Sequence, residues 1–436
     1  MSEKVKLTIK QIFNLAFNYQ KHNNFKLAKN LYKKIIEVDP KILNVQFNLG
    51  LVYEQLGEYD SAMECYQKTI EINPKFENSY NNLGLIFRKL GNKKKAIEVF
   101  SKLLKINPEY TKTYNNLGLI YADLGKYKEA IENYIITLRY DLKNPSAIEN
   151  LIHALTFYSP DIDHPLIKAN NELKKLNYNQ SFEDLLNNKN LDYYFKKIYK
   201  ILFNIQDTIK NINFNFTQVY RKNEKDLNCE RHHRIFNKSN IIPKFCFGCF
   251  KIQIEPVNVL ELIKLFLIFD KLELSKNNLR KCMVELREKI PGTYKGLIYC
   301  DSLKEAEKII LEIDPLLKAN LKYKINIKRG CTEFYKPYSN FQIIKENQKD
   351  FMYYKKEWEK IEIDSDLNEK YIEKIQVSTI RGLSVSDILI INQWINYAIL
   401  IGDKSYLKVG LKTFQSDFIN NKMSQQTEFR RNQFIC

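Results

Sequence analysis

Glycine is scarce in this sequence. Only 13 of the 436 residues are glycine, and none of them forms the clustered loop that cradles a nucleotide phosphate between a strand and a helix. The sequence also lacks a Ser-His-Asp order, an HExxH motif and a carboxylate pair in a context that would mark it as catalytic. These absences argue against glycine-loop nucleotide enzymes and the common hydrolases, and they leave open whether the chain is an enzyme.

Long hydrophobic runs are also missing. The longest apolar stretches, LIKLFLIF and ILIINQWINYAILI, are too short or too interrupted to span a bilayer. The first residues, MSEKVKLTIKQIF, enter an amphipathic pattern directly and lack the organisation of a signal peptide. We therefore expect a soluble, cytoplasmic protein without a membrane partner. Its eight cysteines should then be reduced thiols or metal ligands rather than disulfides.

Arginine is rare, although the formal net charge is +18. Arginine is the residue best suited to forked phosphate contacts, whereas almost all the positive charge here is lysine. The basic residues are scattered apart from short clusters such as NKKK at 92–95 and RHHR at 231–234. Nucleic-acid binding is therefore an alternative interpretation and not the leading one.

What the sequence does contain is an internal repeat. Pro40, Pro74 and Pro108 stand 34 residues apart and register four repeats. The repeats cover residues 9–42, 43–76, 77–110 and 111–144. Three columns recur in them: small residues at Ala28, Ala62, Ala96 and Ala130, aromatic residues at Tyr32, Tyr66, Phe100 and Tyr134, and a small residue at Ala16, Gly50, Gly84 and Gly118. This pattern predicts four helix–turn–helix units, because small residues let paired helices approach and proline ends the second helix.

The pattern resembles the tetratricopeptide repeat and covers about one third of the chain. The resemblance implies an α-solenoid whose concave groove binds extended polypeptides, the usual role of such arrays. The fourth repeat departs from the pattern, because Leu142 stands where proline is expected and Pro145 follows three residues later.

An asparagine recurs in the first helix of each repeat, at Asn14, Asn48, Asn82 and Asn116. The amide group can both donate to and accept from a peptide backbone. This column resembles the asparagine ladder of the repeat arrays in O-linked N-acetylglucosamine transferases, which holds an extended polypeptide. The resemblance implies that these four residues bind a protein or peptide partner. The alternative is that they bond neighbouring helices.

The remainder of the chain divides into three predicted segments. Residues 145–228 are predicted to be capping and connecting helices. Residues 229–335 alternate with period two in four places, which predicts strands beginning near 250, 282, 294 and 323, with helices over 257–274 and 302–313. The order β-α-β-β-α-β is that of a ferredoxin-like α+β domain, in which strands one and two run in one direction and strands three and four in the other.

Residues 336–436 are predicted to be a helical C-terminal subdomain. Its clearest segments are SVSDILIINQWINYAILIG at 384–402 and DKSYLKVGLKTFQSDFI at 403–419. The predicted fold is therefore an α-solenoid, a ferredoxin-like domain and a helical segment.

Thiols recur at one end of the predicted sheet. Cys246 and Cys249, in CFGC, precede strand one, while Cys300 and Cys331 close strands three and four. Thiolates gathered from several loops suit zinc or an iron–sulfur cluster. We expect Cys246, Cys249, Cys300 and Cys331 to be the ligands, with Cys229 and Cys282 as further candidates. Inert buried thiols and a redox pair formed by Cys246 and Cys249 are the alternatives.

Two histidines stand close to Cys229 in sequence. His232 and His233, in RHHR, are weaker ligand candidates, and we expect them to be solvated or base-like surface residues.

The leading interpretation is a tetratricopeptide protein-interaction module coupled to a thiol-rich, metal-binding domain. The first alternative is a protein-modifying enzyme whose repeats select the substrate. The second is nucleic-acid binding by the basic α+β domain. YKGLIYC at 294–300 loosely resembles the third-strand motif of RNA-recognition domains, and Lys295, Gly296 and Tyr299 match it. Leu297, however, replaces an aromatic residue that would stack on a base.

Overall fold

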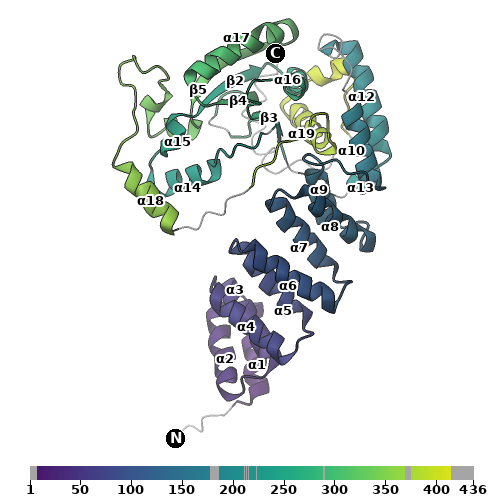
Figure 1. The fold of residues 1–436 in the computed structure, drawn as a ribbon, viewed down its shortest axis with the longest axis vertical. Coiled ribbons are helices and arrows are strands. Elements are labelled where there is room, and N and C mark those ends of the chain that lie inside the picture. The colour runs from purple at the N-terminus through teal and green to yellow at the C-terminus, as the bar shows by residue number, and fades with distance from the viewer. Residues whose placement is uncertain are drawn as a thin grey trace. The chain divides into compact units, whose positions relative to one another are not determined.

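The computed structural model describes residues 7–176, 186–210, 212, 214, 216–221, 223–287, 290–368 and 375–413 (Figure 1). Its contacts divide the chain into two compact units. The first unit comprises Met1–Ala122 and Glu132–Leu142, and the second comprises Asp123–Ile131 and Lys143–Cys436. No helix among the described residues is long and apolar enough to cross a membrane.

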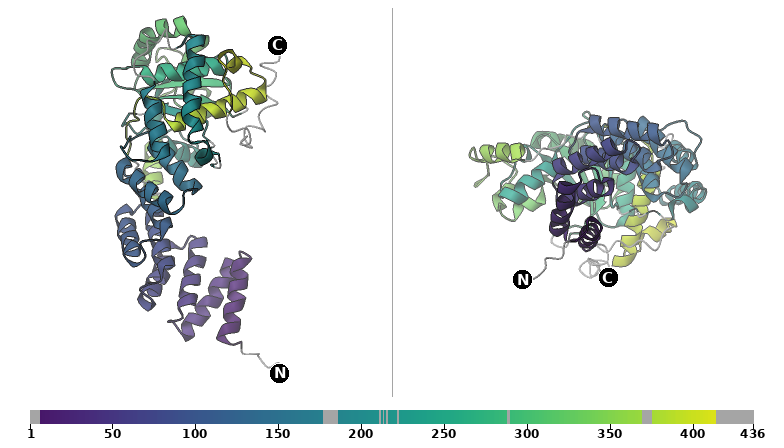
Figure 2. Two further views of the ribbon diagram at one scale, coloured as in Figure 1. Left: turned by 90° about the vertical axis from the view of Figure 1, so that its right-hand side faces the viewer. Right: turned by 90° about the horizontal axis from the view of Figure 1, so that it is seen from below.

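Helices alone make up the predicted repeats. Their bounds are α1 Ile9–Lys21, α2 Phe25–Val38, α3 Leu43–Gln55, α4 Tyr59–Ile72, α5 Glu77–Lys89, α6 Lys93–Ile106, α7 Thr111–Asp123 and α8 Tyr127–Tyr140. In the first three repeats the two helices of each repeat pack together, and α2 and α4 also pack on the first helix of the next repeat (Figure 2). The predicted helix–turn–helix units are thus confirmed.

The small-residue column of the repeat allows close packing between the two helices. A Cβ atom added at Gly84 would lie 2.5 Å from a ring atom of Phe100, which is well inside van der Waals contact. Phe100 itself is completely buried. The same approach recurs between the equivalent residues Gly50 and Tyr66 and between Gly118 and Tyr134. In these repeats a large aromatic ring on the second helix therefore fills the space beside a glycine on the first helix.

The second unit begins with helices and continues into a mixed domain. Its helices are α9 Pro145–Ala154, α10 Pro165–Lys175, α12 Asn188–Phe203, α13 Gln206–Ile209, α14 Cys229–Ser239, α15 Lys244–Phe247, α16 Val259–Lys271, α17 Leu303–Asn320, α18 Trp358–Asn368 and α19 Val385–Ile401. Its strands are β1 Gln218–Arg221, β2 Phe250–Pro256, β3 Arg280–Val284, β4 Tyr294–Cys300 and β5 Tyr323–Arg329. Short 3-10 helices follow as η1 Thr332–Tyr335, η2 Ser339–Gln342 and η3 Ser405–Val409.

The strands form one small antiparallel sheet in the order β1-β3-β4-β2-β5. Because β2 and β3 both pair antiparallel with β4, they share a direction, and β4 and β5 run the other way. These are the predicted directions, and the elements from 250 to 329 follow in the predicted order. The edge strand β1 was not predicted. Its four residues, QVYR, are too few for a period-two pattern to stand out.

The two faces of the sheet differ in character. α16 and α17 pack on one face, where Ile252 and Ile298 are fully buried and a Cβ atom at Gly296 would lie 2.4 Å from the side chain of Leu265. The side chains that alternate with these, among them Lys251, Lys281, Lys295 and Lys328, belong to the other face. The sheet is therefore apolar toward α16 and α17 and basic on its opposite side.

The predicted helix at 384–402 is confirmed as α19. Ser384 caps its N-terminus and exchanges hydrogen bonds with Asp387 in a capping box. The prediction of a helix over 403–419 is wrong for the described residues. Only the short η3 forms there, and the chain leaves it at Gly410 with a φ of +60°, a left-handed conformation that stops a helix. Residues 414–419 of that prediction lie outside the described residues.

Candidate functional site

The basic face of the sheet lines a cavity of about 900 Å³. Its floor is made of side chains from β1, β3, β4, β2 and β5, and its walls come from α14, η1 and the loops at 223–228 and 285–287. Five lysines and Arg287 line the cavity against three carboxylates, which belong to Asp226, Glu285 and Glu333. This volume lies within the usual range of ligand pockets, roughly 300–1,000 Å³.

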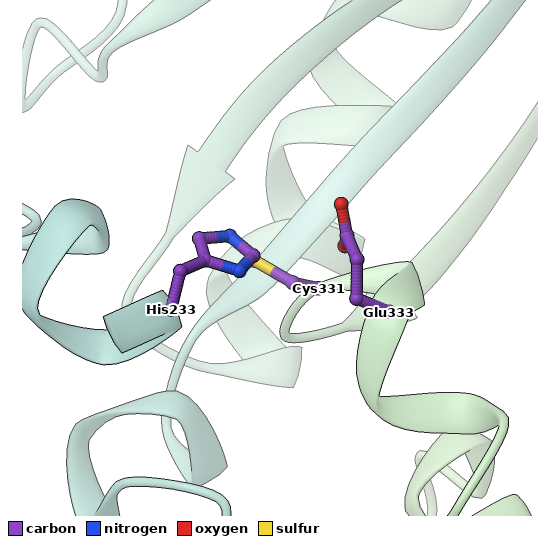
Figure 3. A group of neighbouring side chains, drawn as sticks. All are labelled: His233, Cys331 and Glu333. Carbon is purple, nitrogen blue, oxygen red and sulfur yellow. The ribbon is translucent and has the colours of Figure 1, made fainter. Parts of the chain in front are cut away.

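Cys331 lies in this cavity next to two basic groups, Lys251 and His233. Figure 3 shows the His233 ring beside the Cys331 sulfur. Lys251 donates a hydrogen bond to its Sγ over 3.1 Å, and the ring of His233 also hydrogen-bonds to the sulfur. Burial by itself raises the pKa of this thiol, but the Lys251 ammonium group and His233 outweigh burial and lower the pKa to about 6. The contact with Cys331 raises the pKa of His233 in turn. The arrangement favours a thiolate paired with an imidazolium.

Glu333 completes a small group of potential ligand atoms. In the part of the chain that the structure describes, the ligand atoms of His233, Cys331 and Glu333 lie within 4.8 Å of one another. Glu333 also forms an ion pair with Arg287. Arg287 binds Glu285 through two hydrogen bonds of 2.7 Å each, so this arginine bridges the two carboxylates.

The predicted metal ligands are not all brought together. Of Cys246, Cys249, Cys300 and Cys331, only Cys331 belongs to a group of potential ligands within the described residues. Cys246 is buried in an aromatic cluster that includes Phe334, Phe341 and Trp358. The Cys300 thiol points at the Ile298 carbonyl oxygen, 3.9 Å away.

The other thiols are partly gathered around Cys331. Burial is the largest cause that raises the pKa of Cys229, Cys246 and Cys249, and negative charge on Cys331 raises each of these pKa values further. Cys229, Cys246 and Cys249 therefore lie near Cys331, whereas the predicted group also contained Cys300. Cys282 does not join them. It lies in the middle of β3, opposite Gly296 on the face that α16 covers, and not at the strand opening.

The two adjacent histidines have different environments. His232 is buried, its ring stacks on Phe245 with centroids 5.1 Å apart, and burial lowers its pKa to about 4. The expectation of solvated surface residues is wrong for His232. His233 is half-buried and contacts Cys331, which makes it a functional candidate that sequence reasoning placed too low. Helical neighbours point about 100° apart, so one residue of such a pair can enter the core while the other faces a cavity.

Three cavity lysines were also missed as functional residues: Lys251, Lys281 and Lys328. Lys251 and Lys328 lie in predicted strands, and Lys281 directly precedes the strand predicted to begin near 282. The available signal was that four separate strands each carry a lysine, at Lys251, Lys281, Lys295 and Lys328. The register of the paired strands puts these four lysines on one side of the sheet, because every second residue of a strand shares a face. Only the covering by α14 and η1 turns that side into a cavity.

The asparagine column lies on the first helix of every repeat, on α1, α3, α5 and α7. Asn14 is exposed, and the other three are partly exposed. The Asn116 amide donates to Asn81 over 3.3 Å, and the Asn82 amide donates to the Tyr66 hydroxyl over 3.3 Å. The Asn48 amide donates to the carbonyl oxygen of Asn44 within its own helix. The column is therefore accessible, and its members also make local bonds.

Family models described as tetratricopeptide repeat match residues 12–42, 44–76, 65–98 and 113–146, and one described as TPR repeat matches 84–125. Residues 12–146 are tetratricopeptide repeats. This confirms the resemblance drawn from the 34-residue spacing and gives the chain a protein-interaction module. No curated protein matches the chain.

Several solved structures are similar to part of this chain. One is the crystal structure of the MamA protein, which is 20% identical, covers 47% of this chain and 94% of its own, and has a TM-score of 0.34. Another is YrrB, described as a TPR protein with an unusual peptide-binding site, at 20% identity, 34% and 76% coverage and a TM-score of 0.30.

Proposed function

We propose that the tetratricopeptide array binds an extended polypeptide through Asn14, Asn48, Asn82 and Asn116. The observation that carries this proposal is the asparagine column itself, one residue on the first helix of each repeat and all four at least partly exposed. An amide offers two donors and an acceptor oxygen with two lone pairs. Asn82 and Asn116 each keep donor and acceptor capacity beyond the bonds they make with Tyr66 and Asn81.

Replacing Asn48, Asn82 and Asn116 together by alanine should weaken polypeptide binding at least tenfold. Each lost hydrogen bond contributes about 0.5–1.5 kcal/mol, and tenfold in affinity corresponds to about 1.4 kcal/mol. The full chain is first used to select binding peptides from a random display library, and the affinities of these peptides are then measured by fluorescence anisotropy.

Asn30→Ala is the matched control for this test, because Asn30 is an exposed asparagine on the second helix α2. It should leave the affinity unchanged. If the triple variant binds the selected peptides as tightly as the unaltered chain, the column only bonds neighbouring helices.

The sheet of the second unit supports assignment to the ferredoxin-like arrangement. Its elements β2-α16-β3-β4-α17-β5 alternate in the required order. Strand β2 lies between β4 and β5, and β3 pairs with the other side of β4. Strand β1 then extends this sheet by one member beside β3.

Metal binding by Cys246, Cys249, Cys300 and Cys331 stays a prediction. If it is right, protein purified without oxygen will contain about one zinc ion per chain or show the visible absorption of an iron–sulfur cluster. A metal-free protein that is fully folded would contradict it. The charges around Cys331 oppose such a site, since Lys251 lies 3.1 Å from the sulfur and a cation bound there would face this ammonium group.

An enzyme whose repeats select a protein substrate is the second candidate function. The observation that favours it is the contact of Cys331 with His233 and Lys251 at the wall of a cavity. A thiol activated by an imidazole is a common nucleophile in group transfer. Nucleic-acid binding has less support, because the sheet face that would stack bases lies beneath residues of α14.

A further inference from the structure

The cavity above the sheet holds three lysines that lack a carboxylate partner. Within the described residues, no carboxylate oxygen lies within ion-pair distance of Lys251, Lys281 or Lys328, which we call the lysine cluster. Lys251 contacts the Cys331 sulfur and lies over the ring of Tyr299. Lys281 donates to the amide oxygen of Gln218, and Lys328 donates to the Thr332 hydroxyl. Their polar partners are therefore the Cys331 sulfur and two neutral oxygens.

The carboxylates that could neutralise the cluster are engaged elsewhere. Glu285 binds Arg287 through both oxygens and also accepts a hydrogen bond from Lys295 over 3.1 Å. Glu333 is paired with Arg287. These ion pairs lie at the side of the cavity formed by the 285–287 loop and η1. Among the hydrogen-bond partners that the described residues offer the three lysines, the Cys331 thiolate is therefore the one negative group.

The members of the cluster are close enough to repel one another. Burial is the largest cause that lowers the pKa of Lys281, to about 8, and that of Lys328, to about 7, and the charge of Lys251 is the next largest cause for both. Lys251 and Lys328 stand opposite each other on β2 and β5, where the side chains of a cross-strand pair are neighbours. Holding ammonium groups together in a half-buried cavity is unfavourable unless an anion joins them.

We propose that this cavity binds a phosphate-bearing small molecule, with the phosphate held between Lys251, Lys281 and Lys328. A phosphate carries up to two negative charges and several acceptor oxygens, so it can accept hydrogen bonds from all three ammonium groups at once, which a single carboxylate does less well. No glycine-rich loop is needed, because the lysines converge from three strands of a rigid sheet.

The rest of the cavity fits the non-phosphate part of such a molecule. Its volume of about 900 Å³ far exceeds that of a bare phosphate ion. Apolar walls are supplied by Leu279, Met283, Leu286 and Leu297, with the rings of Tyr220 and Tyr299 beside them. This combination of a few convergent charges and an apolar lining is typical of small-molecule sites. The proposal does not depend on polypeptide binding by the repeats.

Binding of pyrophosphate, inorganic phosphate and AMP to the full chain, measured by calorimetry at low ionic strength, tests the proposal. We expect pyrophosphate to bind, and Lys281→Gln and Lys328→Gln each to weaken it about tenfold or more, because each removes a charge-assisted hydrogen bond. Lys328→Arg keeps the charge and should keep most of the affinity, which separates loss of charge from loss of folding. The comparison of inorganic phosphate with AMP distinguishes free phosphate from a phosphorylated molecule as the source.

Lys308→Gln is the matched control, because Lys308 is an exposed lysine of α17, which packs on the other face of the sheet. Saturating pyrophosphate should also slow the alkylation of Cys331, which lines the same cavity. The proposal is overturned if pyrophosphate neither binds nor protects Cys331, or if Lys308→Gln weakens binding as much as the cavity variants do. It is also overturned if single-stranded RNA occupies the site through the same lysines far more tightly than pyrophosphate, because the ligand is then a nucleic acid.

Discussion

Iodoacetamide at pH 7 will modify Cys331 about a hundredfold faster than Cys229. Both thiols are half-buried and line the same cavity, so access by the reagent is similar. The pKa of Cys331 is lowered to about 6, whereas burial raises that of Cys229 to about 11. The thiolate fractions at pH 7 then differ by about four orders of magnitude, and the lower intrinsic nucleophilicity of the more acidic thiolate returns about two of them. Mass spectrometry of timed, quenched digests measures both rates.

The pH dependence of this alkylation follows from the directions in which the pKa values of the two thiols are shifted. A lowered pKa means that the Cys331 rate rises as pH climbs through about 6 and is flat above about pH 7. The Cys229 rate should still be rising at pH 9. Equal rates for the two thiols at pH 7, or a Cys331 rate that keeps climbing above pH 8, would show that the Cys331 thiol is not activated.

Two variants assign the cause of the activation. Lys251→Met removes the ammonium group 3.1 Å from the sulfur and should shift the rate profile of Cys331 toward higher pH. His233→Gln removes the second basic neighbour and should shift it in the same direction. Lys276→Met is the control, because Lys276 is an exposed lysine whose ion pairs are made with Asp301 and Glu305.

Arg221→Met will destabilise the second unit by about 3–5 kcal/mol, because it leaves buried carboxylates without their counter-charge. Arg221 is 4% exposed and Asp270 and Asp387 are each 2% exposed. Its Nε donates to Asp270 over 2.5 Å, and its two terminal nitrogens donate to the two oxygens of Asp387 over 3.1 Å each. This group joins β1, α16 and α19. Urea unfolding of the full chain, followed by circular dichroism, measures the change.

Arg381→Met is the matched control for the buried group. Arg381 pairs with Glu273 while both side chains are more than half exposed, and an exposed pair of this kind contributes about 0–1 kcal/mol. The combination of Arg221→Met with Asp270→Asn should be less destabilising than the sum of the two single changes, because each removes a charge that the other leaves unpaired. Strict additivity, or a loss below 1 kcal/mol for Arg221→Met, would contradict this account.

The repeat array could be predicted closely because its information is local and repeated. Each helix–turn–helix unit of 34 residues buries its small and aromatic residues within the unit and against the neighbouring units. The same residue types therefore recur at the same positions of every repeat. The close approach of Gly84 to Phe100 is a direct consequence of that pattern. The strand order of the second unit could be predicted in part from the sequence, because strands recognised by their period of two and joined by right-handed connections can pair in only a few ways.

The candidate site was predicted less well, because it depends on what covers the sheet. The sequence placed Cys331 at the end of a strand, but it gave Lys251 no role and assigned His233 to the surface. Their proximity to Cys331 joins residues 233, 251 and 331, which are far apart in the chain. The residue pattern of a single helix or strand cannot reveal such a contact.

By itself, the sequence determined that the first third of the chain consists of tetratricopeptide repeats and where each repeat carries an asparagine. It also put Lys251, Lys281, Lys295 and Lys328 in or directly beside predicted strands. Only the tertiary structure decided that α14 and η1 close over those lysines, and that Lys251 and His233 meet Cys331 there. The physical reason is that helix and strand periods record which side of an element is apolar, whereas the charge around a thiol is set by groups that folding brings from distant segments.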